Sequence, residues 1–446
     1  MPNVTRTIGL SLGADLCWPI CYEEILRRLD PLIPVGRDKV RFAVERLTIE
    51  PFDLRQPCKY DLVVDRLTHW YSVSREWIKK SILMDDLYVF NNPWAIQSME
   101  KHTTYAAMMA LGLPVPETWM IPPKEYEPKP DLQVTLDRYA KLFDLGAVGA
   151  QLGYPSYLKP YDGGGWQGVS RIEDEARLKQ SYEESGRNVM HLQQAIEPYD
   201  QFVRVIGLGP QLKAIRYDPA QPLHDRYTMD QGFVNAEDLK TLEDMTLTIN
   251  AFFGWDFNSC EALSKDGVWH PIDFANACPD SQVTSLHYHF PWLVLANLKW
   301  SLFVAATKRP MRRSLDWNPF YEIARGAAPY REKLAAYADI ARARFDQARF
   351  EEFCGTHLKD LHEVAWEFFG TDTAKDAVRQ KVAALYPANE VERFTELFFA
   401  RIQRWREDSV RGELVAAAPA GKPAGGPPAA PTAKPKPVPR RKKPGA

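Results

Sequence analysis

The sequence has few cysteines, no long uninterrupted apolar run and almost no net charge. Six cysteines in 446 residues, without a CxxC pair, do not make a disulfide framework and fit a reducing compartment. The longest apolar run, residues 292–307, contains Asn297 and Lys299 and is too short to span a bilayer. The N-terminal segment is a poor secretory signal, because its apolar stretch ends at Asp15. We therefore expect a cytoplasmic protein without a membrane partner.

The near-zero charge argues against a nucleic-acid partner for the chain as a whole. The formal net charge is -2, but residues 415–446 hold seven basic and no acidic residues, so the rest carries about -9. Nine prolines and nine alanines in the same stretch cannot build a packed core. We expect a disordered basic tail over residues 411–446, with weak contact to an anionic partner as the alternative role.

The spacing of apolar residues changes along the chain and predicts α/β and α+β parts. Strand and helix patterns alternate over residues 1–95, which is typical of a small open α/β domain. Strand patterns dominate from residue 154 to 274, and helical spacing dominates from residue 290 to about 406. The expected domains are an N-terminal α/β domain (1–95), an α+β domain (96–290), a helical region (291–410) and the tail.

A lysine followed by a glycine-rich turn is the first segment with chemical meaning. A predicted strand ends near Lys159, and three consecutive glycines follow, Gly163, Gly164 and Gly165. Such glycines let the backbone approach a bulky anion and turn its N–H groups toward it. The lysine adds a positive charge for phosphate oxygens. No Gly-Lys-Ser/Thr follows, so this is not a Walker phosphate loop.

An acidic hairpin about a hundred residues later is the second such segment. Predicted strands over residues 258–263 and 268–273 are joined by a turn that contains Asp-Gly. This pairing places Glu261 opposite Asp273, and Asn276 follows the second strand. Two carboxylates and an amide oxygen suit Mg²⁺ that bridges phosphate groups.

Taken in order, these segments resemble the ATP-grasp superfamily, in the region of glutathione synthetases and ribosomal-protein glutamate ligases. The resemblance is carried by residues 92–101 and 111–118, the Lys159 strand with its glycines, QQAIE at 193–197, VRVIG at 203–207, and the acidic hairpin. It covers roughly residues 1–290. It implies an ATP-grasp fold, with ATP between two α+β subdomains and the glycine turn closed over the phosphates.

The resemblance also implies residue roles. The matched positions are Lys101 and Lys159 for the ATP phosphates; Gln194, Ala195 and Ile196 for adenine; Glu197 or Asp200 for the ribose; Arg204 and Arg216 for the transferred phosphoryl group or the substrate; and Glu261, Asp273 and Asn276 for the metal. The usual Glu-x-Asn ending is here Asp-Phe-Ala-Asn at 273–276, and the extra residue implies a bulge or a shifted ligand.

The activity that the resemblance implies is an ATP- and Mg²⁺-dependent ligase. It would join a small-molecule carboxylate to an amine or thiol through an acyl phosphate. Two alternatives stay open. Residues 61–70 are similar to the N-terminal signature of inositol trisphosphate kinases, which share the ATP-grasp fold and would make the protein a small-molecule kinase. The altered ending at 273–276 instead favours a non-catalytic ATP-binding scaffold. Self-association of the chain is also left open.

Overall fold

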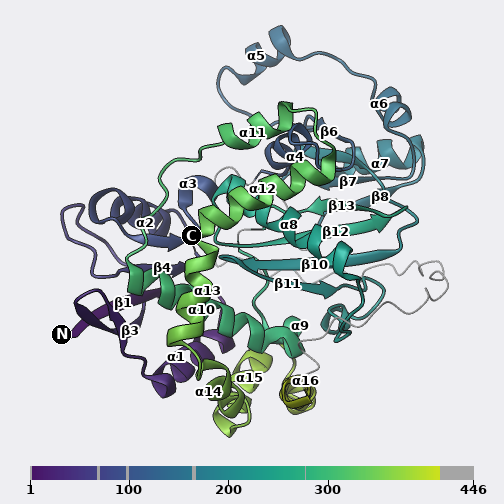
Figure 1. Cartoon of the computed structure of the whole chain (residues 1–446). Helices are drawn as coiled ribbons and strands as arrows, with labels where there is room; N and C mark the ends of the chain where they lie inside the picture. Colours follow the sequence, from purple (N-terminus) through teal and green to yellow (C-terminus); the bar gives the residue numbers. More distant parts are fainter. Residues whose placement is uncertain (1–2, 68–70, 97–99, 163–166, 277, 412–446) are drawn as a thin grey trace, which may run out of the picture.

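The computed structural model describes residues 3–67, 71–96, 100–162, 167–276 and 278–411 (Figure 1). Its first part is a five-stranded sheet in the order β2-β3-β1-β4-β5. The strands are β1 (Asn3–Ser11), β2 (Ile33–Val35), β3 (Asp38–Arg46), β4 (Leu62–Asp65) and β5 (Tyr88–Phe90). Strands β3, β1, β4 and β5 run parallel, and β2 runs antiparallel to β3. Leu62, Val63 and Val64 are all buried, as expected of a parallel strand covered on both faces.

Helices α1 (Cys17–Leu29) and α2 (Ser72–Asp85) accompany this sheet. Two short helices, α3 (Pro93–Ile96) and α4 (Lys101–Ala110), then lead into the second part of the chain. Helix α4 ends where Gly112 adopts a positive φ of 82°, a backbone conformation that glycine reaches without steric cost.

Two four-stranded antiparallel sheets follow. The first has the order β6-β9-β7-β8, with β6 (Thr118–Ile121), β7 (Ser156–Pro160), β8 (Ser170–Ile172) and β9 (Met190–Gln194). The second has the order β11-β10-β12-β13, with β10 (Gln201–Leu208), β11 (Gln211–Arg216), β12 (Phe257–Lys265) and β13 (Val268–Asp273). The segment between β6 and β9 also contains three helices: α5 (Leu132–Tyr139), α6 (Leu145–Leu152) and α7 (Glu175–Ser185). Helix α8 (Ala236–Phe253) packs on the second sheet. The expected mixture of α/β and α+β architecture is confirmed.

The acidic hairpin forms as the sequence predicts. Strand β12 pairs with β13 so that Glu261 lies directly opposite Asp273. The register shifts between this pair and the next, Ala262 with Pro271, so Ile272 is the extra residue of a bulge. The bulge lies one residue before Asp273 and changes the direction of the strand at that point.

The rest of the described chain is helical. After α9 (Val283–Leu286) and the 3-10 turn η2 (His287–His289) come α10 (Phe290–Thr307), α11 (Asn318–Arg325), α12 (Tyr330–Phe345), α13 (Gln347–His357), α14 (Leu361–Phe368), α15 (Asp372–Leu385) and α16 (Val391–Arg411). Helix α10 packs on β1, β4 and β10, and α12 packs on α8 (Figure 1). The segment Val283–Thr307 is long and apolar enough to cross a membrane by composition, but its most apolar window is 83% buried, so α10 is a core helix.

Most buried apolar side chains belong to one core that joins the N-terminal sheet, the β10–β13 sheet and the helices. The β6–β9 sheet has a separate small core, which includes Leu158, Leu178 and Leu192. The two antiparallel sheets therefore meet without a common apolar core in the described part of the chain, and the surfaces between them are left for polar groups.

A buried carboxyl group links the N-terminal sheet to the core helix. Both the Tyr88 hydroxyl and the Trp300 indole donate hydrogen bonds to Asp256 Oδ1, at 2.9 and 3.0 Å. Burial raises the pKa of Asp256 to about 6, and the positive charge of Arg309 only partly opposes this. The carboxyl group is 5% exposed, so its ionisation costs free energy in the folded protein.

We predict that Asp256 makes the protein less stable as pH rises from about 4 to 6. Between these values only the folded state holds the proton, so each pH unit lowers the free energy of unfolding by about 1.4 kcal/mol. Asp256→Asn keeps the acceptor oxygen and removes the ionisation. The free energy of unfolding is measured by denaturant titration for the variant and for wild type. The difference, variant minus wild type, should rise by about 2 kcal/mol from pH 4.5 to pH 7.5. An unchanged difference at the two pH values would contradict this assignment.

Candidate active site

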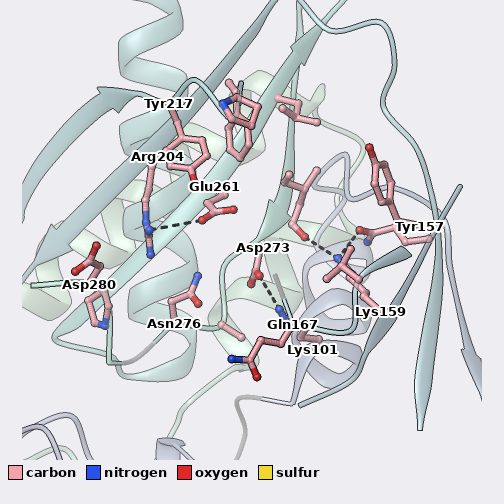
Figure 2. A pocket seen from close by; sticks show the side chains of 18 of the residues that line it. Lys101, Tyr157, Lys159, Gln167, Arg204, Tyr217, Glu261, Asp273, Asn276 and Asp280 are labelled. Atoms are coloured by element: carbon pink, nitrogen blue, oxygen red, sulfur yellow. Dashed lines mark hydrogen bonds and ion pairs between the residues drawn. The ribbon is translucent and has the colours of Figure 1, made fainter. Parts of the chain in front are cut away.

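A cavity of about 1280 Å³ lies between the two antiparallel sheets. Strands β7 and β9 supply one wall, and β10, β12 and β13 supply the other. Residues from the loop 217–227 and from the segments 275–276 and 278–285 complete the lining. Figure 2 shows that the side chains of both walls point toward one another. The lysine of the first predicted segment and the carboxylates of the second therefore share one cavity.

Two lysines enter the cavity from different elements. Lys101 opens helix α4, and Lys159 lies near the end of β7. Lys159 Nζ donates to the Tyr105 hydroxyl at 2.9 Å, to Gln193 Oε1 at 2.7 Å and to the Ile272 carbonyl at 3.3 Å. The Tyr105 hydroxyl donates in turn to the same Ile272 carbonyl at 2.8 Å. The bulge at Ile272 thus supplies the acceptor that fixes Lys159.

Burial lowers the pKa of Lys159 to about 8, although the charge of Asp273 opposes the shift. The ammonium group is therefore charged at neutral pH but is held in a place where water solvates it poorly. Such a group gains more from a bound anion than an exposed lysine does, because little solvent is displaced when the anion arrives. The geometry favours a multiply charged anionic ligand next to Lys159.

The two carboxylates of the hairpin have different surroundings. Lys101 Nζ donates to Asp273 Oδ2 at 2.6 Å, whereas Glu261 lies 3.7 Å from the nearest guanidinium nitrogen of Arg204. Burial alone would raise the pKa of Asp273, but Lys101 and Lys159 outweigh it and lower the pKa. Burial raises the pKa of Glu261, and Arg204 opposes this only partly. Glu261 therefore forms an ion pair with Arg204 that is longer than the hydrogen bond between Lys101 and Asp273.

The carboxylates and Asn276 fit a hard divalent cation. Asp273 Oδ1 is buried and accepts no hydrogen bond from any described residue. Asn276 Nδ2 donates to the Ser259 carbonyl at 3.3 Å, which leaves the amide oxygen available on the cavity side. Oxygen ligands of this kind suit Mg²⁺. The described residues contain no group of three or more His, Cys, Asp or Glu side chains that could hold a metal, so other oxygens would have to complete the coordination.

The positions predicted for adenine and ribose are only partly brought together. Gln194, Ile196 and Glu197 line the cavity, but Ala195 does not. Glu197 accepts hydrogen bonds from the Tyr157 hydroxyl at 2.6 Å and from Arg171 at 2.8 Å. Asp200 is exposed and lies outside the cavity lining. The predicted glycines Gly163, Gly164 and Gly165 fall outside the described residues.

The two predicted arginines lie on opposite faces of their sheet. Arg204 lines the cavity and donates to Ser259 Oγ at 3.0 Å. Arg216 is exposed, pairs with Asp230 at 3.3 Å and does not line the cavity. The cross-strand partner of Arg216 is Val203, the neighbour of Arg204, and successive strand residues point to opposite faces. The sequence therefore placed Arg216 wrongly beside the cavity.

The sequence analysis missed several residues that line the cavity, and also Tyr105, which contacts Lys159 but does not line the cavity. Tyr105 follows Lys101 by four residues, which places both on one face of a helix. Gln193 lies opposite Tyr157 in the β7–β9 ladder, two residues from the partner of Lys159, so strand alternation would have indicated it. Arg226 and Tyr227 come from the loop after β11, where no periodic pattern exists to indicate them.

Comparisons with known proteins give structural similarity only. No protein-family model and no curated protein matches the chain. A RimK domain ATP-grasp protein from Sphaerobacter thermophilus is similar over 61% of this chain and 92% of its own, with 15% identity and a TM-score of 0.43. The D-alanine–D-alanine ligase of Bacillus anthracis, solved with ATP, is similar over 76% of this chain and 99% of its own. The identity is 12% and the TM-score is 0.43.

A third solved structure, the ATP-grasp ligase PsnB with its minimal precursor, is similar over 62% of this chain and 91% of its own. The identity is 15% and the TM-score is 0.38. The first and the third of these structures are ATP-grasp proteins. At these TM-scores the likeness is weak, and the function proposed below rests on the cavity itself.

We predict that Lys101 and Asp273 depend on each other for stability. Lys101→Met leaves the Asp273 carboxylate without its closest cation and should cost about 2 kcal/mol of unfolding free energy, less than for a fully buried pair, because Asp273 is 26% exposed. In an Asp273→Asn background the same substitution should cost much less, since no charge is left uncompensated. The double-mutant cycle is measured by denaturant unfolding. Equal costs in the two backgrounds would show that the pair is not coupled.

Proposed function

We propose that the protein is an ATP- and Mg²⁺-dependent ligase that joins a carboxylate to an amine or thiol through an acyl phosphate. One observation carries the proposal. Lys101 and Lys159, from two separate elements, share one cavity with the Glu261–Asp273 pair, and Lys101 bonds directly to Asp273 (Figure 2). Paired cations opposite paired carboxylates suit a polyphosphate whose charge is shared between the protein and a metal ion.

In this proposal the nucleotide lies along the cavity. Its phosphates lie beside Lys159 and the acidic hairpin, and its base lies near Gln194 and Ile196. Apolar side chains of Phe202 and Leu263 line the same cavity and would cover the faces of a flat base. Glu197 is the better candidate for the ribose than Asp200, because only Glu197 lines the cavity. Its hydrogen bonds with Tyr157 and Arg171 hold it in place.

The metal ligands in this proposal are Glu261, Asp273 and Asn276. Mg²⁺ held there would neutralise the charge of the phosphate oxygens and orient them. The lysines then have two tasks: Lys101 holds Asp273 in position, and Lys159 contacts the phosphate oxygens directly. The hydrogen bonds from Lys159 to Tyr105, Gln193 and Ile272 hold the ammonium group at the cavity and engage its three N–H groups, so a phosphate oxygen would replace one of these partners.

The reaction needs no nucleophile from the protein. The substrate carboxylate attacks the γ-phosphorus, ADP leaves, and the amine or thiol then displaces phosphate from the acyl phosphate. Arg204 lines the cavity near Glu261 and is the candidate for the carboxylate and the transferred phosphoryl group. Catalysis of this kind depends on positioning and on electrostatic stabilisation.

The proposal is tested by ATP consumption in the presence of pooled substrates. The full chain is incubated with ATP, Mg²⁺ and pools of common carboxylates and L-amino acids, and products are identified by mass spectrometry. A ligase gives ADP, free phosphate and a condensed product. With a carboxylate labelled with heavy oxygen, the released phosphate should carry one labelled oxygen. A phosphorylated product without free phosphate would instead identify a kinase.

Lys159→Ala and Asp273→Ala should each lower turnover by about a hundredfold or more, because the first removes a cation beside the phosphates and the second removes a proposed ligand of Mg²⁺. Lys179→Ala is the matched control. Lys179 is exposed and lies on α7, in the same part of the chain as Lys159. In the described structure it pairs only with Glu175, so its loss should leave turnover unchanged. Wild-type rates in the Lys159 and Asp273 variants would support a non-catalytic scaffold.

We further predict that ATP affinity falls as pH rises through about 8. Below this pH the Lys159 ammonium group is charged and attracts phosphate, and above it the free protein loses that charge. Lys159→Arg should bind more weakly overall but keep a flat profile between pH 7 and 9, because arginine stays charged. Calorimetric titration with a non-hydrolysable ATP analogue measures both profiles. A flat wild-type profile would argue against contact between Lys159 and the phosphates.

A further inference from the structure

A loop contributes several of the residues that line the cavity. Residues 217–230, here called the acceptor loop, connect β11 to the segment before α8. Tyr217, Leu223, Arg226 and Tyr227 from this loop line the cavity. Arg226 donates to the Tyr217 hydroxyl at 3.4 Å, and Tyr227 contacts Arg204, so the loop forms the wall next to the proposed transfer site.

The loop is partly held by its own hydrogen bonds, which include two to the Asp218 carboxylate. The Asp218 amide donates to the Arg226 carbonyl at 2.8 Å, and the Thr228 amide donates to the Arg216 carbonyl at 3.0 Å. These bonds close the base of the loop. Its tip, the 3-10 turn η1 (Leu223–Asp225), holds no buried side chain. A loop with an exposed tip pays a large entropic cost to keep one shape unless other elements hold it.

Helix α16 supplies that support from the far end of the chain. Arg401 donates to the His224 carbonyl at 2.9 Å and forms an ion pair with the Asp225 carboxylate. The His224 ring packs edge-on against Phe394, with 5.2 Å between ring centroids. The Arg401 side chain is 16% exposed, so water competes little for these bonds.

The turn before α10 holds the other side of the loop. His289 Nε2 donates to the Thr228 carbonyl at 2.7 Å, and His289 is buried. Tyr288, from the same turn, donates its hydroxyl to Asp408 of α16 at 3.0 Å. The turn and the helix are thus joined to each other as well as to the loop. None of Arg401, His224, Asp225 and His289 lines the cavity.

We propose that α16 is a clamp that fixes the acceptor loop, and that Arg401 is a positioning residue that determines how the second substrate binds. The inference rests on the proposed function only for its kinetic consequence. The clamp itself follows from the contacts of Arg401 and His289 with the loop. The clamp gives a role to helices of the C-terminal part, α10 to α16. The last residue along the chain that lines the cavity is Ser285, so none of these helices contributes to the lining.

The test compares Arg401→Ala, Arg401→Lys and Arg379→Ala in the full chain. Arg379 is the matched control, because it pairs with Glu392 of α16 and has no contact with the loop among the described residues. Amide hydrogen exchange should become about tenfold faster over residues 218–230 in Arg401→Ala and remain unchanged in Arg379→Ala. Arg401→Lys keeps the ion pair with Asp225 but loses the forked geometry of the guanidinium group. Its exchange rate over residues 218–230 should therefore lie between the rates of wild type and Arg401→Ala.

Kinetic measurements then distinguish a positioning role of Arg401 from a general loss of folding. With the amino-acid pool as the probe, the pool concentration that gives half-maximal phosphate release should rise about fivefold in Arg401→Ala, while the KM for ATP stays within about twofold. Unchanged exchange in the loop would overturn the clamp. Faster exchange with an unchanged response to the pool would overturn its role in substrate binding. If wild type consumes no ATP with any pool, the proposed function fails, while the exchange experiment still decides whether α16 holds the loop.

Discussion

The structure depends on how it compensates charge in the cavity between its two antiparallel sheets. Lys101, Lys159, Glu261 and Asp273 lie together in this cavity, where Lys101 is buried and the other three are half-buried. Lys101 and Asp273 form a hydrogen-bonded ion pair, Lys159 donates to neutral oxygens, and Glu261 forms a longer ion pair with Arg204. The incomplete compensation leaves a cation and an anion ready for a ligand that brings both phosphate and metal.

The fold supports this arrangement because the two sheets belong to separate apolar cores. Polar contacts between the two parts include the Lys159 bond to the Ile272 carbonyl and the bond from Lys265 Nζ to the Glu197 carbonyl at 2.7 Å. Groups of this kind can exchange partners with a ligand at small cost, whereas packed apolar side chains cannot. The large core instead fixes β10–β13 against α8 and α10, so the acidic hairpin stands on the rigid part of the molecule.

The sequence predicted those parts of the site that depend on local pattern. The pairing of Glu261 with Asp273 follows from a tight turn between alternating strands, and Lys159 from the end of a short apolar strand. Arg216 was misplaced because a one-residue difference in strand position moves a side chain to the other face of the sheet. The contact between Arg401 and the loop at His224 spans 177 residues and rests on tertiary packing, for which the sequence carries no local signal.

In the proposed function, the strand of Lys159 and the acidic hairpin contact the same nucleotide. A crystal structure of the full chain with Mg²⁺ and a non-hydrolysable ATP analogue would show whether they do. We expect the triphosphate between Lys159 and Asp273, the metal ion on Glu261 and Asp273, and the base beside Gln194 and Ile196. A nucleotide bound elsewhere on the molecule, or a cavity that stays empty at saturating nucleotide, would contradict it.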